Sequence, residues 1–143
     1  MIRELESFEV DTIMDIWLKT NIRAHSFIPE KYWLDNYNVV KEEYLPMSET
    51  FVYVEDDVIR GFIGVIDDHF IGALFVMEEY QGKGVGRRLL DHCKSLCSDL
   101  ELGVYSENKM AIRFYTKNGF RVKKEQPNED SGFMEYLMSW KKE

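Results

Sequence analysis

The chain has 143 residues, enough for one domain with a sizeable core and too few for two comfortable domains. Apolar residues make up 45% of it and aromatic residues 14%, which is typical of a folded globular protein and excludes a disordered chain. The formal net charge of −8 argues against nucleic acid as the main partner, because phosphate binding needs a basic field, and it suits a cationic substrate.

No apolar run approaches the length that spans a bilayer, and the N-terminal MIRELESFEV lacks the basic start and apolar stretch of a signal peptide. We therefore expect a cytoplasmic protein without a membrane partner. No repeat or linker divides the sequence, so residues 1–143 are expected to form one domain, as a monomer or a homodimer.

The elements predicted along the chain alternate between strands and helices. Strands are predicted over residues 2–6, 50–55, 58–66, 69–77, 100–106, 119–126 and 132–140, with acidic turns after the second and third. Helices are predicted from Asp11 to Arg23, from Pro29 to Pro46, from the glycine-rich segment to about Ser98, and over residues 107–118 up to Gly119. The order β-α-α-β-β-β-α-β-α-β-β predicts an α/β fold, a mixed sheet of about seven strands with helices on its faces.

Cys93 and Cys97 lie four residues apart on the third helix, beside His92. Cys93 belongs to the apolar stripe of that helix and Cys97 lies at its edge, so we expect both thiols to be reduced and part of the core. No second ligand pair with zinc spacing appears, and no metal site is expected.

The segment YQGKGVGRR, residues 80–88, places three glycines where a helix must begin. A Walker loop needs Ser or Thr after Gly-Lys, but Gly84 follows Lys83. A dinucleotide fingerprint needs G-x-G-x-x-G after the first strand of its unit, whereas this G-x-G-x-G follows a late strand. A third pattern, Q/R-x-x-G-x-G/A between a strand and a helix, fits Gln81, Gly84 and Gly86.

The third pattern has a physical basis in diphosphate binding. A helix N-terminus has unpaired N–H groups and about half a positive charge, and glycines let a diphosphate approach them. Lys83, Arg87 and Arg88 add positive charge to the same segment. Taken alone, the segment leaves open a second interpretation, a glycine turn that caps a solvated basic helix.

A second segment, NKMAIRFYTKNGF at residues 108–120, places Asn108, Ala111 and Tyr115 on one helix face. A polar, a small and a phenolic residue on one face can line a slot beside an extended ligand. The alternative is an amphipathic helix with a tyrosine at the edge of the core.

Together the two segments resemble the GNAT superfamily of acetyl-CoA-dependent N-acetyltransferases. LFVMEEYQGKGVGRRLL, residues 74–90, is similar to the family's central strand, pyrophosphate loop and helix, and residues 108–120 are similar to its N-x-x-A-x-x-F-Y-x-x-x-G-F segment. Glu78 stands where the family often has proline. An N-terminal pattern resembles the bacterial subgroup that includes the YiaC and YjaB proteins; it is carried by Trp17, Thr20, His25, Phe27, Ile28, Tyr32 and Trp33.

This resemblance implies the GNAT fold, in which acetyl-CoA is the cosubstrate and lies between splayed parallel strands that end here near Val76 and Tyr105. Val76 N–H is then expected to bind the thioester carbonyl oxygen, and Tyr115 to act as the general acid that protonates the thiolate. The implied cofactor-binding residues are Leu74, Phe75, Val76, Gln81, Gly82, Lys83, Gly84, Val85, Gly86, Arg87 and Asn108.

The expected acceptor is a primary amine that attacks directly in a ternary complex: a protein or peptide lysine, an N-terminal amine or a small amine. The candidate substrate contacts are His25, Phe27, Tyr32, Trp33 and Phe70. The candidates for a general base are His25, Asp67, Asp68, His69 and Glu79. Two other functions stay open, a non-catalytic acyl-CoA-binding regulatory module and acetyl transfer to a non-amine nucleophile.

Overall fold

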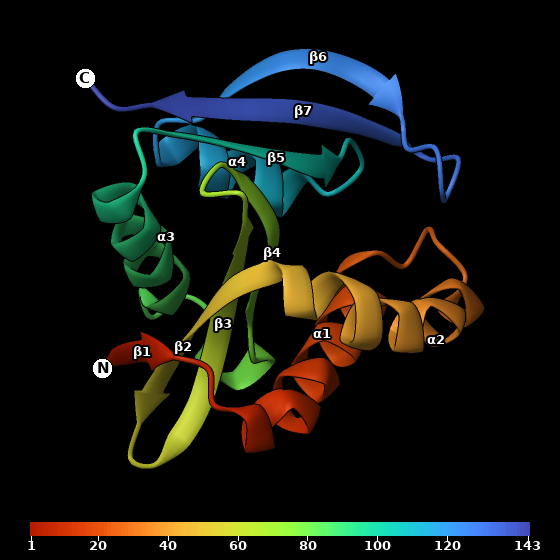
Figure 1. The fold of residues 1–143 in the computed structure, drawn as a ribbon. Helices are drawn as coiled ribbons and strands as arrows, with labels where there is room; N and C mark the ends of the chain where they lie inside the picture. Colours follow the sequence, from red (N-terminus) through yellow and green to blue (C-terminus); the bar gives the residue numbers. More distant parts are fainter.

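A computed structural model describes residues 1–143 and contains the strands and helices in the predicted order (Figure 1). The α-helices are α1 (Val10–Ala24), α2 (Glu30–Val39), α3 (Val85–Leu96) and α4 (Lys109–Lys117). The strands are β1 (Ile2–Glu4), β2 (Ser48–Glu55), β3 (Val58–Ile66), β4 (Phe70–Val76), β5 (Asp99–Tyr105), β6 (Arg121–Pro127) and β7 (Met134–Lys141). They form one seven-stranded sheet in the order β1-β2-β3-β4-β5-β7-β6, so the predicted α/β class and mixed sheet are confirmed.

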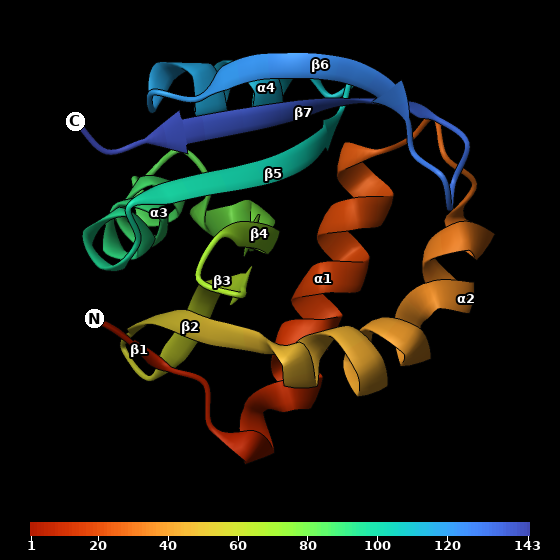
Figure 2. The ribbon, with the colours of Figure 1, turned by 45° about the horizontal axis from the view of Figure 1, so that its top comes forward.

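Helices cover both faces of this sheet, with α1 and α2 on one side and α3 on the other (Figures 1 and 2). Both faces are covered because apolar side chains point to both of them, as β2 illustrates, where successive side chains alternate between the two faces. Phe51 and Tyr53 pack in a cluster with Leu89 of α3, whereas Val52 packs with Ile13 of α1. Because both faces are buried, the strands carry long apolar runs. None of the helices is long and apolar enough to cross a membrane.

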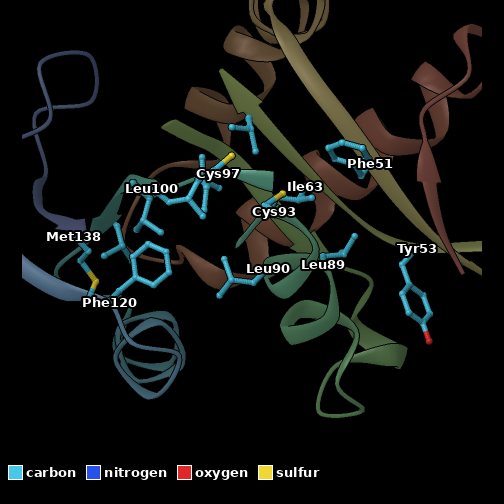
Figure 3. Packing of buried hydrophobic residues seen from close by; sticks show 14 of the residues in the cluster. Phe51, Tyr53, Ile63, Leu89, Leu90, Cys93, Cys97, Leu100, Phe120 and Met138 are labelled. Atoms are coloured by element: carbon cyan, nitrogen blue, oxygen red, sulfur yellow. The ribbon is translucent and has the colours of Figure 1, made fainter. Parts of the chain in front are cut away.

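Both cysteines lie in the core on the α3 side, where Figure 3 shows them among buried apolar side chains. Cys93 and Cys97 are buried free thiols, and burial raises the pKa of the Cys93 thiol to about 12. The prediction that they are reduced core residues is confirmed.

The two acidic turns join β2 to β3 and β3 to β4. Asp56 and Asp57 both have positive φ, as do Asp67 and Asp68, which is the pattern of type I′ turns. Asp and Asn tolerate this left-handed backbone better than other side chains. The acidic pairs are therefore explained by backbone geometry.

The second helix departs from the predicted span at its end. It begins after Pro29 as expected, but α-helical winding ends at Val39. A wider π-helical turn, Val40–Tyr44, and a tight 3-10 turn, Leu45–Met47, follow. Pro46 lacks the N–H that would continue α-helical bonding, so the last turns adopt other spacings.

The parallel strands β4 and β5 are joined at only one end. Phe70 lies opposite Glu101 as their one parallel pair, and the Glu101 N–H donates to the His69 carbonyl over 2.9 Å. Beyond this point β5 pairs with β7 along its whole length, and no further ladder joins it to β4. The strands therefore splay, as the resemblance implied.

Candidate functional site

A cavity of about 220 Å³ lies between the splayed strands β4 and β5. Its strand walls are residues 71–75 and 102–105. Side chains from both faces of the sheet complete it: Trp17, Asn21, His25 and Trp33 from the α1–α2 side, and Asn108, Ala111 and Tyr115 from the α4 side. The cavity thus connects the two faces of the sheet.

The β4 edge of this gap carries unpaired backbone groups. The Met77 N–H donates to the Arg60 carbonyl over 2.9 Å, and hydrogen-bonded and non-bonded pairs alternate along an antiparallel ladder. Every second residue of β4, counted from Met77, therefore bonds β3. Val76 and Leu74 lie between these residues, so their N–H groups point away from β3 and toward the gap. An extended ligand can pair with such an edge as an added strand.

A bulge lies at the inner end of the same edge. The register between β3 and β4 shifts so that Ala73 lies opposite Gly64 and Ile71 opposite Val65, which leaves Gly72 as an extra residue. Bulges bend a strand and interrupt its pairing. This bulge helps β4 to diverge from β5.

The glycine-rich loop connects β4 to α3 with a bare, left-handed backbone. Gly82 has φ of 77° and Gly84, the N-cap of α3, has φ of 85°, values that only glycine adopts without strain. The Gln81 side-chain amide donates to the Val76 carbonyl over 2.9 Å, which ties the loop to the end of β4. The first bond of the helix is from the Arg88 N–H to the Gly84 carbonyl. The N–H groups before it have no partner within the helix, which is the arrangement that binds phosphate groups.

Gly86 differs from the other two glycines because it lies inside α3 and has no left-handed φ. A Cβ at this position would lie 3.4 Å from Cζ of Phe114 and 3.6 Å from Cγ2 of Val76, which are ordinary van der Waals distances. Packing space alone therefore does not require glycine here, and Gly86 stays a predicted cofactor contact.

The two arginines of α3 differ in orientation. Arg87 is exposed and lies 3.6 Å from Asp91 on its own helix. Arg88 donates from Nη1 to the Tyr53 hydroxyl over 3.2 Å, and its guanidinium carbon lies 3.9 Å from where a Cβ of Gly84 would be. Arg88, which the sequence-based set of cofactor residues omits, is thus the arginine beside the loop.

Tyr115 lines the cavity together with Asn108 and Ala111, as expected for one face of α4. Its ring packs edge-on against Phe114 and Phe120, with centroids 5.2 Å and 5.6 Å away. Burial raises the pKa of the Tyr115 phenol, because charge is disfavoured away from water. The phenol therefore keeps its proton at neutral pH.

Asn108 connects the two sides of the cavity. Its Oδ1 accepts from the Ala111 N–H over 3.2 Å and caps α4. Its Nδ2 lies 3.1 Å from Nε2 of His25, at the C-terminal end of α1.

His25 is buried in an aromatic surround. Its ring stacks on Trp33 at 5.3 Å and meets Tyr105 and Phe27 edge-on at 5.1 Å and 5.7 Å. Burial lowers the pKa of His25 to about 4, against a smaller opposing effect of the Asn21 backbone. The imidazole is therefore neutral at pH 7.

Three predicted substrate contacts do not line the cavity. Phe27 and Tyr32 form a layer behind it: Phe27 packs on His25, and the Tyr32 hydroxyl donates to Oδ2 of Asp130 over 2.5 Å. Phe70 lies at the joined end of β4 and β5 and does not itself line the cavity, although its neighbour Ile71 does. Its sequence position at the start of β4 suggested proximity to the acceptor, and that contact stays a prediction.

Four of the five candidate bases also lie outside the cavity lining, which includes only His25. Asp67 and Asp68 form a turn, Glu79 is exposed, and both nitrogens of His69 face carboxylates.

Sequence reasoning missed Asn21 and Tyr105 as lining residues. Trp17, Asn21 and His25 follow one another at four-residue spacing, which places them on one face of α1. A polar residue such as Asn21 on the apolar side of α1 is unusual, and this pattern could have indicated that Asn21 lines a site. Its Nδ2 donates to the Trp17 carbonyl over 2.9 Å, and its Oδ1 makes no hydrogen bond within the protein.

Comparisons with known proteins agree with this arrangement. Residues 30–142 match the model of the acetyltransferase (GNAT) domain. The peptidyl-lysine N-acetyltransferase YiaC of Escherichia coli is 31% identical over 140 residues, which cover 98% of this chain and 96% of YiaC. The solution structure of apo YjaB from Escherichia coli superposes with a TM-score of 0.86 at 26% identity and covers 100% of this chain and 98% of YjaB. The PaiA N-acetyltransferase of Thermoplasma acidophilum, solved with coenzyme A, shares the fold with a TM-score of 0.82 at 22% identity, over 99% and 98% of the two chains.

Proposed function

Because this chain belongs to the GNAT acetyltransferase family and is an N-acetyltransferase, we propose that it transfers the acetyl group of acetyl-CoA to lysine side chains of peptides or proteins. The name of YiaC, a peptidyl-lysine N-acetyltransferase, supports this acceptor class. The main structural support is the cavity between β4 and β5, which has Tyr115 on one side and the α1–α2 residues on the other.

The residues of this chain fit acetyl-CoA in two places. The N–H groups at the start of α3, beside Gly84 and Arg88, are suited to its diphosphate. The open β4 edge at Leu74 and Val76 is suited to the amides of its pantetheine arm, and the coenzyme A in the PaiA structure supports this class of ligand. Val76 lies just outside the cavity lining, and its N–H remains the proposed donor to the thioester oxygen.

Tyr115 is the proposed general acid. Acetyl-CoA supplies a thioester, whose cleavage by an amine expels a thiolate that needs a proton. A phenol with a raised pKa retains its proton at neutral pH and can donate it to a neighbouring sulfur. The aromatic contacts with Phe114 and Phe120 fix the ring for this role.

The acceptor amine is proposed to enter from the α1–α2 side in its neutral form. No carboxylate lines the cavity, and its one imidazole, His25, has a pKa of about 4 and an Nε2 that faces Asn108. A lysine amine with an ordinary pKa of about 10.4 therefore loses its proton to solvent before it attacks. The rate at subsaturating acceptor is then expected to rise about tenfold per pH unit from pH 7 to 9, until the fraction of neutral amine levels off.

The test is a panel assay of free thiol release from acetyl-CoA with lysine peptides, peptides with a free N-terminal amine and blocked lysines, polyamines and amino sugars. Mass spectrometry then locates the acetyl group. The proposal expects transfer to lysine peptides, with a much lower rate for Tyr115→Phe.

The other outcomes are distinct. Preference for N-terminal amines or small amines would overturn the acceptor assignment and leave the acetyl transfer intact. Acetyl-CoA binding without transfer to any acceptor would instead indicate a non-catalytic acyl-CoA-binding module.

A further inference from the structure

The contact between His25 and Asn108 joins residues 83 positions apart and from opposite sides of the cavity. His25 follows α1 on the acceptor side, and Asn108 begins α4 on the side of Tyr115. Both side chains line the cavity. This inference rests on the proposed function, because it assigns a role within the same site.

The direction of the hydrogen bond follows from the second contact of Asn108. Oδ1 accepts from the Ala111 N–H, so the other end of the amide, Nδ2, must face His25 as a donor. Nε2 of His25 then has to be the acceptor and carries no proton. In a neutral imidazole the proton is therefore on Nδ1, a buried atom without a hydrogen-bond partner in the protein.

The amide nitrogen of Asn108 carries two hydrogens, and His25 occupies one of them. The second remains for an acceptor oxygen in the cavity, such as an amide carbonyl of the pantetheine arm. An asparagine amide that is held at both Oδ1 and Nδ2 cannot rotate, so its second N–H keeps one direction.

We propose that His25 is a positioning residue, whose neutral Nε2 accepts from Asn108 and holds that amide ready to bind the pantetheine arm of acetyl-CoA. His25 then acts through Asn108, which differs from a base that removes a proton from the acceptor. The stacked ring of Trp33 and the edges of Tyr105 and Phe27 keep the imidazole in place.

The first test needs no catalysis. Long-range ¹H–¹⁵N correlation spectra of the imidazole rings at pH 7 report which nitrogen carries the proton, and His25→Gln assigns the His25 signals. We expect the Nδ1–H form. In Asn108→Asp the carboxylate still caps α4, because Asp is a good N-cap, but it offers His25 an acceptor in place of a donor. The proton should then appear on Nε2.

An Nε2–H form in the wild type, or unchanged His25 signals in Asn108→Asp, would overturn the proposal. Both spectra are independent of acetyl transfer, so a failure of the proposed function is recognised separately by the panel assay.

The second test compares two replacements of His25 by acetyl-CoA calorimetry. His25→Gln keeps an acceptor oxygen near the Nε2 position, whereas His25→Leu keeps bulk without an acceptor. We expect the Kd for acetyl-CoA to rise about tenfold in His25→Leu and less than threefold in His25→Gln. Equal loss in both variants, with both folded by circular dichroism, would reduce His25 to a packing residue. If His25→Leu does not fold, the spectra of Asn108→Asp still decide.

Discussion

Phe70 lies opposite Glu101 at the single point where β4 and β5 pair in parallel register, and the neighbouring His69 bonds two carboxylates of β5 there. Nδ1 of His69 lies 2.7 Å from Asp99, and Nε2 lies 3.0 Å from Glu101. Lys123 of β6 reaches Glu101 from the other side, at 2.6 Å. The closed end of the gap is therefore fastened by charged side chains as well as by backbone.

His69 should make stability depend on pH. Hydrogen bonds to Glu101 and then to Asp99 raise the pKa of His69. Since the folded state binds this proton more tightly, the added stability is fully present below the ordinary histidine pKa of about 6.5 and is lost as pH rises through the folded value. The side chain is 42% exposed, so we expect a contribution below about 1 kcal/mol.

The measurement is urea unfolding of the wild type and of His69→Gln between about pH 3.5 and 9. The difference between the two should be greatest near pH 5.5 to 6.5 and should shrink at higher pH. Below about pH 4.5 it should shrink again, because the bonds from Lys123 and His69 lower the pKa of Glu101. If the difference in unfolding free energy does not change with pH, the pairing of protonated His69 with Asp99 and Glu101 does not contribute to stability.

Tyr115→Phe should lower kcat about a hundredfold while the Kd for acetyl-CoA changes less than twofold. The variant removes only the hydroxyl of this cavity-lining residue and keeps the ring contacts with Phe114 and Phe120. Tyr136→Phe is a matched control, because Tyr136 is also partly buried against the same core and lies outside the cavity lining. Wild-type turnover in Tyr115→Phe would refute the general acid assignment.

Gly84→Asp should raise the Kd for acetyl-CoA at least about tenfold, because it adds a side chain and a negative charge at the start of α3. It should also destabilise the fold by roughly 1–2 kcal/mol, since φ of 85° is left-handed. Gly132→Asp controls for that strain: Gly132 has φ of 80°, and a Cβ there meets nothing within 4 Å. Calorimetry that gives both variants the same affinity would count against the loop as the diphosphate site.

Arg88→Gln should weaken acetyl-CoA binding about tenfold or more, whereas Arg87→Gln should weaken it less than threefold. Arg88 lies beside Gly84 and has no carboxylate partner, and a charge-assisted hydrogen bond contributes about 1.5–3 kcal/mol. Arg87 is exposed next to Asp91. The two Kd values should be compared at low and high salt, because the loss in Arg88→Gln should be smaller at high salt. Equal effects of the two variants would contradict the orientation of these arginines.

Local patterns in the sequence were sufficient for the elements, their order and part of the cavity lining. The apolar spacing of the helices, the acidic pairs of the turns and the glycines after β4 each depend on neighbours a few residues away. The faces they predict hold in the structure, as the common lining role of Asn108, Ala111 and Tyr115 shows. The breakdown of α2 after Val39 was not predicted, because apolar spacing before Pro46 indicates a helical segment without distinguishing α from π and 3-10 winding.

The sequence by itself determined that β4 is followed by a helix with a glycine-rich start and that β5 is followed by a helix that carries Tyr115. Short-range periodicity is sufficient for this, because it sets which side chains share a face. Only the tertiary structure decided that Arg88 lies beside Gly84, that Phe70 lies at the closed end of the gap, and that His25 meets Asn108. These relationships join segments that are distant in the chain. They depend on where β4 and β5 separate and on how closely helices pack across the sheet, which spacing along a single element does not specify.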